Sequence, residues 1–208
     1  MRAVWIVLTA GLAATVLSAC SILPKTEPVD VYRLPTDWTR AVAGSTAAAP
    51  WSLRVATPMA SEALNSPRIA VLPQADLISR YKGVRWSDPA PVLLRNRIVE
   101  GFAKDGRVQK LSTNDSNLQA DYELGGELRA FQTEYRAGAV DVVVRLDARL
   151  VQASSLRIVA SRRFEVRQPL TDTQVPGVIA GFGQASDRLV AQLVDWTLSQ
   201  ASPQPKNQ

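Results

Sequence analysis

Three consecutive segments in the second half of the chain constrain its fold most, because each alternates between apolar and polar residues. They are Tyr122 to Tyr135, Val140 to Leu150 and Ile158 to Val166. A period of two residues places alternate side chains on opposite faces of a strand. Such alternation is typical of antiparallel strands with one covered face. In the first segment the apolar positions change parity, which predicts a β-bulge near Ala130.

The second and third segments are predicted to form a hairpin around a turn from Ala153 to Leu156. Their apolar faces coincide only if paired positions have equal parity, and a turn centred near Ser155 makes paired residue numbers sum to about 310. The expected pairs are Leu146 with Phe164, Val144 with Val166, Arg145 with Glu165 and Asp147 with Arg163. The apolar parity of the third segment holds Ile158, Ala160, Phe164 and Val166. Arg162 shares this parity, so it must lie near a sheet edge or have a partner.

Shorter β-rich runs and two amphipathic helices surround these segments. The first helix is predicted to begin with Ser87 or Asp88 as its N-cap and Pro89 in its first turn, and to end at Gly106. The last helix extends from about Val175 to Leu198. The other candidate strands are Val29–Leu34, Ser52–Ala56, Arg68–Leu72, Tyr81–Trp86 and Val108–Leu111. This order predicts a single α+β domain, in which a mainly antiparallel sheet carries two helices on one face.

The N-terminus predicts export and lipidation. Arg2 precedes an uncharged, mostly apolar run from Val4 to Val16, which is shorter than the about 20 residues that span a bilayer. Leu17-Ser18-Ala19-Cys20 then forms a lipobox. We therefore expect residues 1–19 to be a lipoprotein signal peptide and Cys20 to carry a diacylglyceryl group and an N-acyl chain. Ser21 favours the periplasmic face of the outer membrane, with the periplasmic face of the inner membrane as the alternative.

The expected layout of the mature protein is a lipidated tether at 20–28, one domain at 29–200 and a disordered tail at 201–208. The chain has a net charge of +5, and loss of Arg2 with the signal leaves +4. Cys20 is the only cysteine and histidine is absent. These facts exclude catalytic sites that need a histidine or a free thiol. No carboxylates cluster at calcium-loop spacing. The composition leaves a Ser/Lys or carboxylate-only enzyme open, but the sequence predicts no catalytic residue, no metal and no cofactor beyond the acyl chains.

An aromatic and basic segment lies just before the first helix. Tyr81, Arg85 and Trp86 are candidate partner-binding residues, because aromatic and arginine side chains are enriched in interface hot spots. The alternative is that Trp86 packs in the core between the sheet and the helix, and Tyr81 could equally do so. Arg80 and Lys82 either form a basic lip with Arg85 or belong to a solvated face. A second basic group consists of Arg157, Arg162, Arg163 and Arg167.

The stretch from Pro67 to Leu111, PRIAVLPQADLISRYKGVRWSDPAPVLLRNRIVEGFAKDGRVQKL, resembles the ABC-type transport auxiliary lipoprotein family, which includes the paraquat-inducible lipoprotein type. Tyr81, the Arg85-Trp86 pair and the helix that starts at Asp88-Pro89 carry the resemblance. The YRLP at Tyr32 to Pro35 is similar to the opening strand of that family, and the lipobox and last helix also fit. The likeness thus covers nearly the whole chain.

The resemblance implies a non-catalytic accessory or docking component of a transporter whose periplasmic component carries an MCE (mammalian cell entry) domain. Such systems move phospholipids or other hydrophobic molecules between the inner and outer membranes. The expected partners are the membrane and the MCE-domain protein, with phospholipid and a second copy of the chain as further possibilities and no nucleic acid. Two alternatives stay open: a lipoprotein that binds a lipid or small hydrophobic ligand itself, and an envelope assembly or structural lipoprotein.

Overall fold

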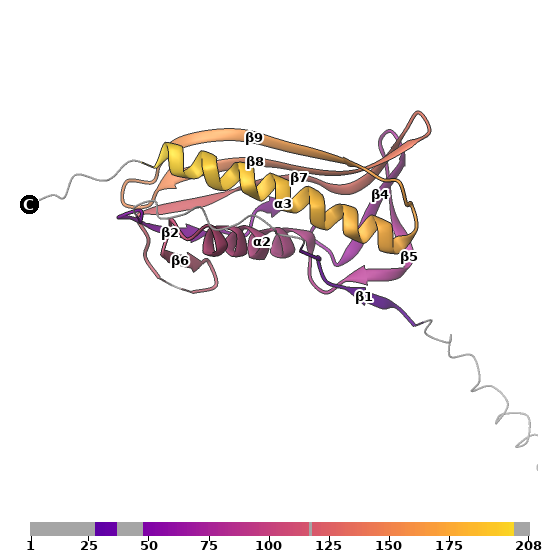
Figure 1. Cartoon of the computed structure of the whole chain (residues 1–208), viewed down its shortest axis with the longest axis horizontal. Coiled ribbons are helices and arrows are strands. Elements are labelled where there is room, and N and C mark those ends of the chain that lie inside the picture. The colour runs from indigo at the N-terminus through magenta and orange to yellow at the C-terminus, as the bar shows by residue number, and fades with distance from the viewer. Residues whose placement is uncertain (1–27, 37–47, 117, 202–208) are drawn as a thin grey trace, which may run out of the picture.

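The computed structural model describes residues 28–36, 48–116 and 118–201, and the chain folds around one sheet with two helices (Figure 1). The predicted signal peptide, Cys20, the predicted tether up to residue 27 and residues 202–208 lie outside the described residues. In chain order the elements are β1 Asp30–Tyr32, β2 Ser52–Val55, β3 Met59–Ala60, β4 Arg68–Gln74, β5 Leu77–Trp86, α2 Ala90–Asp105, β6 Lys110–Thr113, β7 Tyr122–Arg136, β8 Ala139–Gln152, β9 Arg157–Pro169 and α3 Val175–Gln200.

Every predicted strand and helix has a counterpart in these elements, and the two-residue strand β3 is the one that the sequence did not predict. The largest shift in a start position is that of β5, which begins at Leu77 and not at the predicted Tyr81, and β6 begins at Lys110, two residues after the buried Val108. At the C-terminus, Ala201 was assigned to a disordered tail. It is instead the buried residue that ends α3, where its N–H donates to the Thr197 carbonyl at 3.0 Å.

The predicted mainly antiparallel sheet is confirmed in part, because the chain forms one sheet whose longest strand pairs are antiparallel but which also contains parallel pairs. Strand β7 pairs antiparallel with β8 along one edge, and β8 pairs antiparallel with β9. Along its other edge β7 pairs in turn with β2, β3 and β4, and all three are parallel to it. The chain passes through β5, α2 and β6 between β4 and β7, a crossover long enough to bring the chain back in the same direction. The long alternating strands β7, β8 and β9 pair antiparallel with one another, and β4 also pairs antiparallel with β5.

The β8–β9 hairpin has the predicted register. Leu146 pairs with Phe164 and Val144 with Val166, while Arg145 pairs with Glu165 and Asp147 with Arg163. The apolar pairs are buried beneath the helices, and the charged pairs lie on the opposite face. The strands end at Gln152 and begin again at Arg157, so the turn occupies the predicted residues. Equal parity and matched charge were therefore sufficient to fix this register.

Two irregularities bend these strands. The predicted bulge near Ala130 is confirmed, because the β7–β8 register shifts between Leu128 and Ala130. A second shift, between Leu150 and Val151, was not predicted. It moves Ile158 off the buried face, so that Ile158 is 58% exposed. Arg162 is exposed on β9, which pairs only with β8, and its guanidinium lies 4.9 Å from the centroid of the Phe164 ring.

Both helices cover the same face of the sheet, as predicted. Helix α3 lies along β8 and β9, and α2 packs against α3 and the β2–β6 end (Figure 1). Pro89 is the N-cap of α2 and no side chain caps the helix, so Ser87 and Asp88 do not serve as predicted; the Ser87 hydroxyl donates to Asp88 instead. Gly106 ends α2 with φ of 77°, which confirms the predicted C-terminal glycine.

Candidate functional site

The three residues singled out in the sequence lie on β5, and the shape of this strand separates them. Arg68 of β4 faces Arg85, and Ala70 faces Arg80, so two steps along β4 correspond to five along β5. The surplus residues form a bulge around Gly83, which has φ of 69°. Because this φ favours glycine, the bulge is built into the sequence. It changes which side chains of β5 face the helices and which face away.

Trp86 belongs to the core. Its side chain is fully buried, and its ring lies 5.2 Å from Phe182 of α3 and 6.0 Å from Phe131 of β7, centroid to centroid. Its backbone N–H donates to the Pro67 carbonyl at 2.7 Å. Trp86 is therefore not available as a partner-binding residue in this fold, and the core alternative for it is correct.

Tyr81 has a structural role that the sequence left open. Its ring is half-buried against the core, and its hydroxyl lies 3.1 Å from Oγ1 of the buried Thr133 on β7. Burial raises the pKa of the Tyr81 phenol, and the hydrogen bond with Thr133 opposes this rise. Tyr81 thus ties β5 to the middle of the sheet while part of its ring stays exposed. Its predicted contact with a partner stays a prediction.

Arg85 is exposed and belongs to a group of cations that we call the basic cluster, which consists of Arg68, Arg80, Lys82 and Arg85. The Arg85 guanidinium donates to the Trp86 carbonyl at 3.2 Å. None of the ion pairs between described residues includes a member of the cluster. Arg68 and Arg85 are directly opposite each other, an arrangement that destabilises a strand pair through like-charge repulsion. These exposed cations fit both the predicted basic lip and the alternative of a solvated face, and none of them has an ion-pair partner among the described residues.

A shallow groove of about 680 Å³ runs beside the basic cluster. Arg68 and Arg80 line it together with Ile78, Ala70 and one carboxylate, Glu62. Two guanidinium groups beside an aliphatic side chain can bind a phosphate or carboxylate whose carrier has an apolar part.

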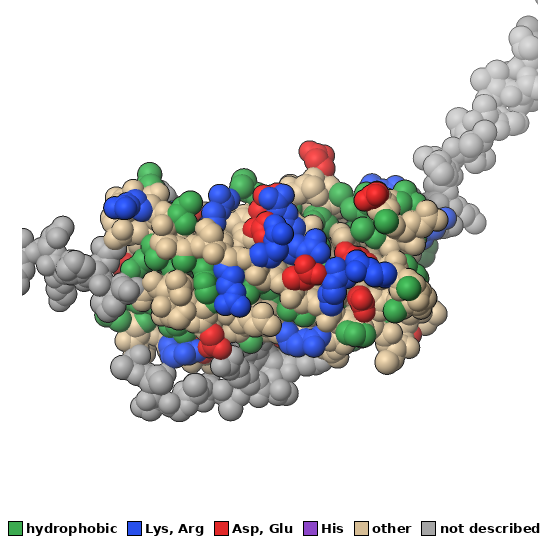
Figure 2. Space-filling view, turned by 90° about the horizontal axis from the view of Figure 1, so that it is seen from above, with side chains coloured by type: hydrophobic (Ala, Val, Ile, Leu, Met, Phe, Trp, Pro, Cys, Tyr) green, Lys and Arg blue, Asp and Glu red, His purple; other side chains and the backbone are tan. Residues whose placement is uncertain are grey.

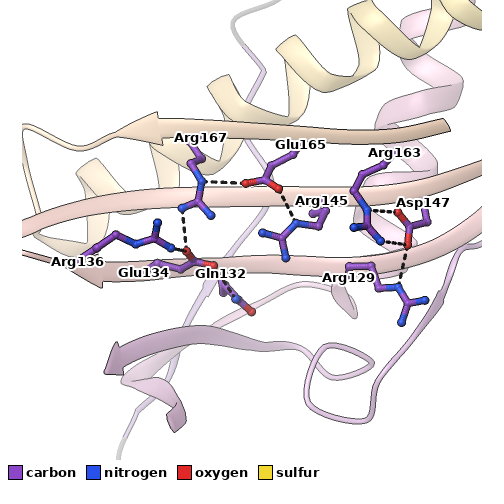
Figure 3. Close-up of polar contacts among 9 residues, drawn as sticks. All are labelled: Arg129, Gln132, Glu134, Arg136, Arg145, Asp147, Arg163, Glu165 and Arg167. Atoms are coloured by element: carbon purple, nitrogen blue, oxygen red, sulfur yellow. Dashed lines mark hydrogen bonds and ion pairs between the residues drawn. The ribbon is translucent and has the colours of Figure 1, made fainter. Parts of the chain in front are cut away.

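A second charged surface covers β7, β8 and β9 on the face opposite the helices, and we call it the ion-pair ladder (Figure 3). Arg163 contacts Asp147 at 2.6 Å, and Arg145 contacts Glu165 at 2.7 Å. Arg167 bridges Glu165 and Glu134, at 2.8 Å to each. The remaining members are Glu127, Arg129 and Arg136. Seen from above, the acidic and basic side chains alternate over this face (Figure 2).

Every arginine of the ladder is in an ion pair, although its five arginines exceed its four carboxylates by one. The hydrogen bond from Arg163, with a further one from Arg129, lowers the pKa of Asp147 to about 2. The hydrogen bond from Arg145 likewise lowers the pKa of Glu165. Each arginine of the ladder thus has a carboxylate partner, which distinguishes this surface from the basic cluster. The ladder has the character of a structural network rather than of a binding site.

The YRLP segment is clamped between the two helices, a feature that the sequence reasoning missed. The buried Arg97 of α2 donates through Nη2 to the carbonyls of Leu34 at 2.9 Å and Pro35 at 2.6 Å. The same guanidinium lies 3.1 Å from Asp187 of α3. A Cβ atom on Gly183 would lie 2.7 Å from the Pro35 carbonyl oxygen, so glycine is required there. Two residues of the sequence could have indicated this clamp: Arg97 and Gly183, each of which lies on an otherwise apolar face of its helix.

In the described part of the chain, no group of three or more carboxylates could hold a metal ion. The same residues include no helix with the length and apolarity needed to cross a membrane.

A family model described as the ABC-type transport auxiliary lipoprotein component matches residues 32–194. An uncharacterized protein of Bradyrhizobium diazoefficiens is 30% identical over 148 residues, which are 71% of this chain and 39% of that protein. The chain thus spans about two fifths of the length of that relative. The crystal structure of a Xanthomonas campestris protein matches with a TM-score of 0.75 and 30% identity, covering 83% of this chain and 96% of that one. A second crystal structure, of an uncharacterized protein, shares the fold, with a TM-score of 0.63, 16% identity and coverage of 82% and 99%.

Proposed function

Because the chain belongs to the ABC-type transport auxiliary lipoprotein family, we propose that it is a non-catalytic lipoprotein of the outer membrane. It faces the periplasm and serves as the docking component of an MCE-linked ABC transporter that moves lipids between the two membranes. The observation that carries this proposal is the family match over residues 32–194, which includes strands β2 to β9, helix α2 and most of α3. The lipobox that ends at Cys20 supports it independently.

The clamp on the YRLP segment suits a docking component. The tether joins the domain at Pro28, and from there the chain enters β1 and then the Arg97 clamp between α2 and α3. A pull on the lipid anchor therefore acts on the packed core and not on a peripheral loop. Two acyl chains hold a protein stably on a membrane, so the domain stays at one bilayer while its partner reaches across the periplasm.

Anchoring is tested by Cys20→Ala. We expect the variant to incorporate no fatty-acid analogue and to keep residues 1–19, because the thiol accepts the diacylglyceryl group before cleavage. Metabolic labelling followed by mass determination of the product measures both effects. Equal labelling of the variant and the unchanged protein would refute the lipoprotein assignment.

Partnership is tested by crosslinking in cells, followed by purification of the lipidated protein in mild detergent. We expect an MCE-domain protein among the crosslinked products. Arg85→Gln and Tyr81→Phe test the partner contact predicted from the sequence, and Arg157→Gln on β9 is a control for loss of one exposed charge. If the MCE-domain protein is absent from the products of the unchanged protein, the docking function is wrong. Native mass spectrometry of the same preparation tests the alternative, since a lipid carrier would retain a bound lipid.

A further inference from the structure

The point at which the tether joins the domain lies close to the basic cluster, because β1 pairs with β5. Strand β1 is parallel to β5, with Asp30 beside Val84 and Val31 beside Arg85. Eight Cα–Cα steps separate Cys20 from Pro28, and a fully extended chain of that length reaches about 28 Å. A lipid on Cys20 therefore holds Pro28 within that distance of the bilayer surface, and β1, which begins two residues later, lies beside the Val84–Trp86 end of β5. This step relies on the lipidation of Cys20 in the proposed function.

We propose that the basic cluster and the exposed aliphatic side chains next to it form a membrane-docking surface, which rests on the phosphate headgroups of the membrane that holds the lipid anchor. Arg68, Arg80, Lys82 and Arg85 contact anionic headgroups there. The proposal assigns a partner to four cations that have no ion-pair partner among the described residues. It also gives a reason for the directly opposed arginines, Arg68 and Arg85, which destabilise the isolated domain.

Aliphatic side chains complete this surface. Val31, which is paired with Arg85, is 51% exposed, and Leu77 and Ile78 at the start of β5 are 52% and 47% exposed. Apolar side chains interleaved with arginines are the composition that binds the interface between headgroups and acyl chains. Four carboxylates, those of Asp30, Glu62, Asp76 and Asp88, lie on the flanking segments, and none of them forms an ion pair with the cluster among the described residues.

Headgroups explain the surface better than an acidic protein does. The bilayer is already within reach of β5, so docking needs no second diffusing component. Each basic residue near an anionic bilayer contributes a factor of about five to the docked-to-undocked ratio. An acidic protein that occupies the same surface is the competing outcome of the experiment below.

The experiment uses the full lipidated protein in vesicles of phosphatidylethanolamine and phosphatidylglycerol. Lipidation consumes the thiol of Cys20, so Leu77→Cys introduces the only free thiol for a fluorophore. Leu156→Cys is the matched control, because Leu156 is 81% exposed in the β8–β9 turn, far from β1. We expect lipids with a headgroup quencher to quench the label at position 77 and to leave the label at position 156 bright. Equal quenching at both positions, or none at position 77, would overturn the proposal.

Charge removal then tests the headgroup contact itself. The triple variant Arg68→Gln, Arg80→Gln and Arg85→Gln is expected to reduce the docked-to-undocked ratio by about 100-fold. The control triple variant, Arg149→Gln, Arg157→Gln and Arg162→Gln, removes the same charge from exposed positions of β8 and β9 and should retain docking. Vesicles of phosphatidylcholine alone should reproduce the loss.

The outcomes separate this proposal from the proposed function. If the first triple variant keeps its quenching but loses the crosslinked MCE-domain protein, the surface is a protein interface and the membrane proposal is wrong. If the unchanged protein crosslinks to that partner while position 77 stays unquenched, the docking function stands and the membrane contact fails.

Discussion

The two charged surfaces of the sheet contain similar residues in opposite electrostatic situations. On β7, β8 and β9 each arginine of the ion-pair ladder meets a carboxylate, as in the pair of Arg145 and Glu165 at 2.7 Å. On β4 and β5 the directly opposed pair is Arg68 and Arg85. Because like charges directly opposite each other destabilise a strand pair, the second arrangement opposes folding of the isolated domain. The ladder contributes to the fold, whereas the cations of the basic cluster have no ion-pair partner among the described residues.

The contribution of the ladder lies in register more than in free energy. An exposed ion pair contributes about 0.2–1 kcal/mol, whereas a slip by one residue would turn buried residues such as Leu146 toward solvent. A slip by two residues keeps the faces but breaks the charge pairs. The ladder therefore selects between registers that the apolar pattern alone leaves equivalent.

The largest expected change in the free energy of unfolding comes from a substitution in the core beneath the basic cluster. Trp86→Ala removes a fully buried ring that contacts Phe131 and Phe182, and should lower the free energy of unfolding by about 3–5 kcal/mol. The neighbouring Arg85→Ala removes an exposed side chain and should change it by less than about 0.5 kcal/mol. Chemical denaturation monitored by tryptophan fluorescence and circular dichroism measures both values. A comparable loss in both variants would mean that the cluster supports the fold and is not reserved for a ligand.

Sequence reasoning succeeded where two independent signals agreed. In the β8–β9 hairpin, side-chain parity and charge matching both led to the pairing of Arg145 with Glu165, and the structure has it. The parallel neighbours of β7 were not predicted, because a short run such as Ser52–Val55 carries no information about the direction of its partner. Trp86 and Tyr81 also could not be separated by sequence. The bulge at Gly83 decides which of them is fully buried, and it depends on pairing with β4.

The pH dependence of the ladder provides a second comparison. The pKa of Asp147 is held at about 2 by Arg163 and Arg129, below the value of an unfolded aspartate of about 3.9. A lowered pKa in the folded state adds stability that is present above pH about 4 and is lost as the pH falls toward 2. Asp147→Asn should therefore lower the free energy of unfolding at pH 7 by about 1 kcal/mol, since two exposed ion pairs are removed.

Thermal unfolding between pH 2 and pH 7 measures this effect. The variant should lose less stability than the unchanged protein on acidification, and the two curves should converge near pH 2. Glu62→Gln is the control, because Glu62 lies beside the basic cluster and forms none of the ion pairs between described residues. If Glu62→Gln reduces the loss of stability on acidification as much as Asp147→Asn does, the carboxylates of the ladder do not differ in this respect from those beside the basic cluster.

The smallest expected effect is the most diagnostic, because its sign differs between the two surfaces. Arg68→Gln removes the repulsion with Arg85 and should raise the free energy of unfolding by a few tenths of a kcal/mol at low salt. Arg145→Gln breaks the pair with Glu165 and should lower it by a similar amount. Added salt screens both interactions, so the two variants should approach the unchanged protein from opposite sides. A double-mutant cycle of Arg68→Gln with Arg85→Gln isolates the repulsion, since the second substitution should gain less once the first is present. If Arg68→Gln instead destabilises the domain as Arg145→Gln does, Arg68 is compensated within the chain, and the difference between the two surfaces disappears.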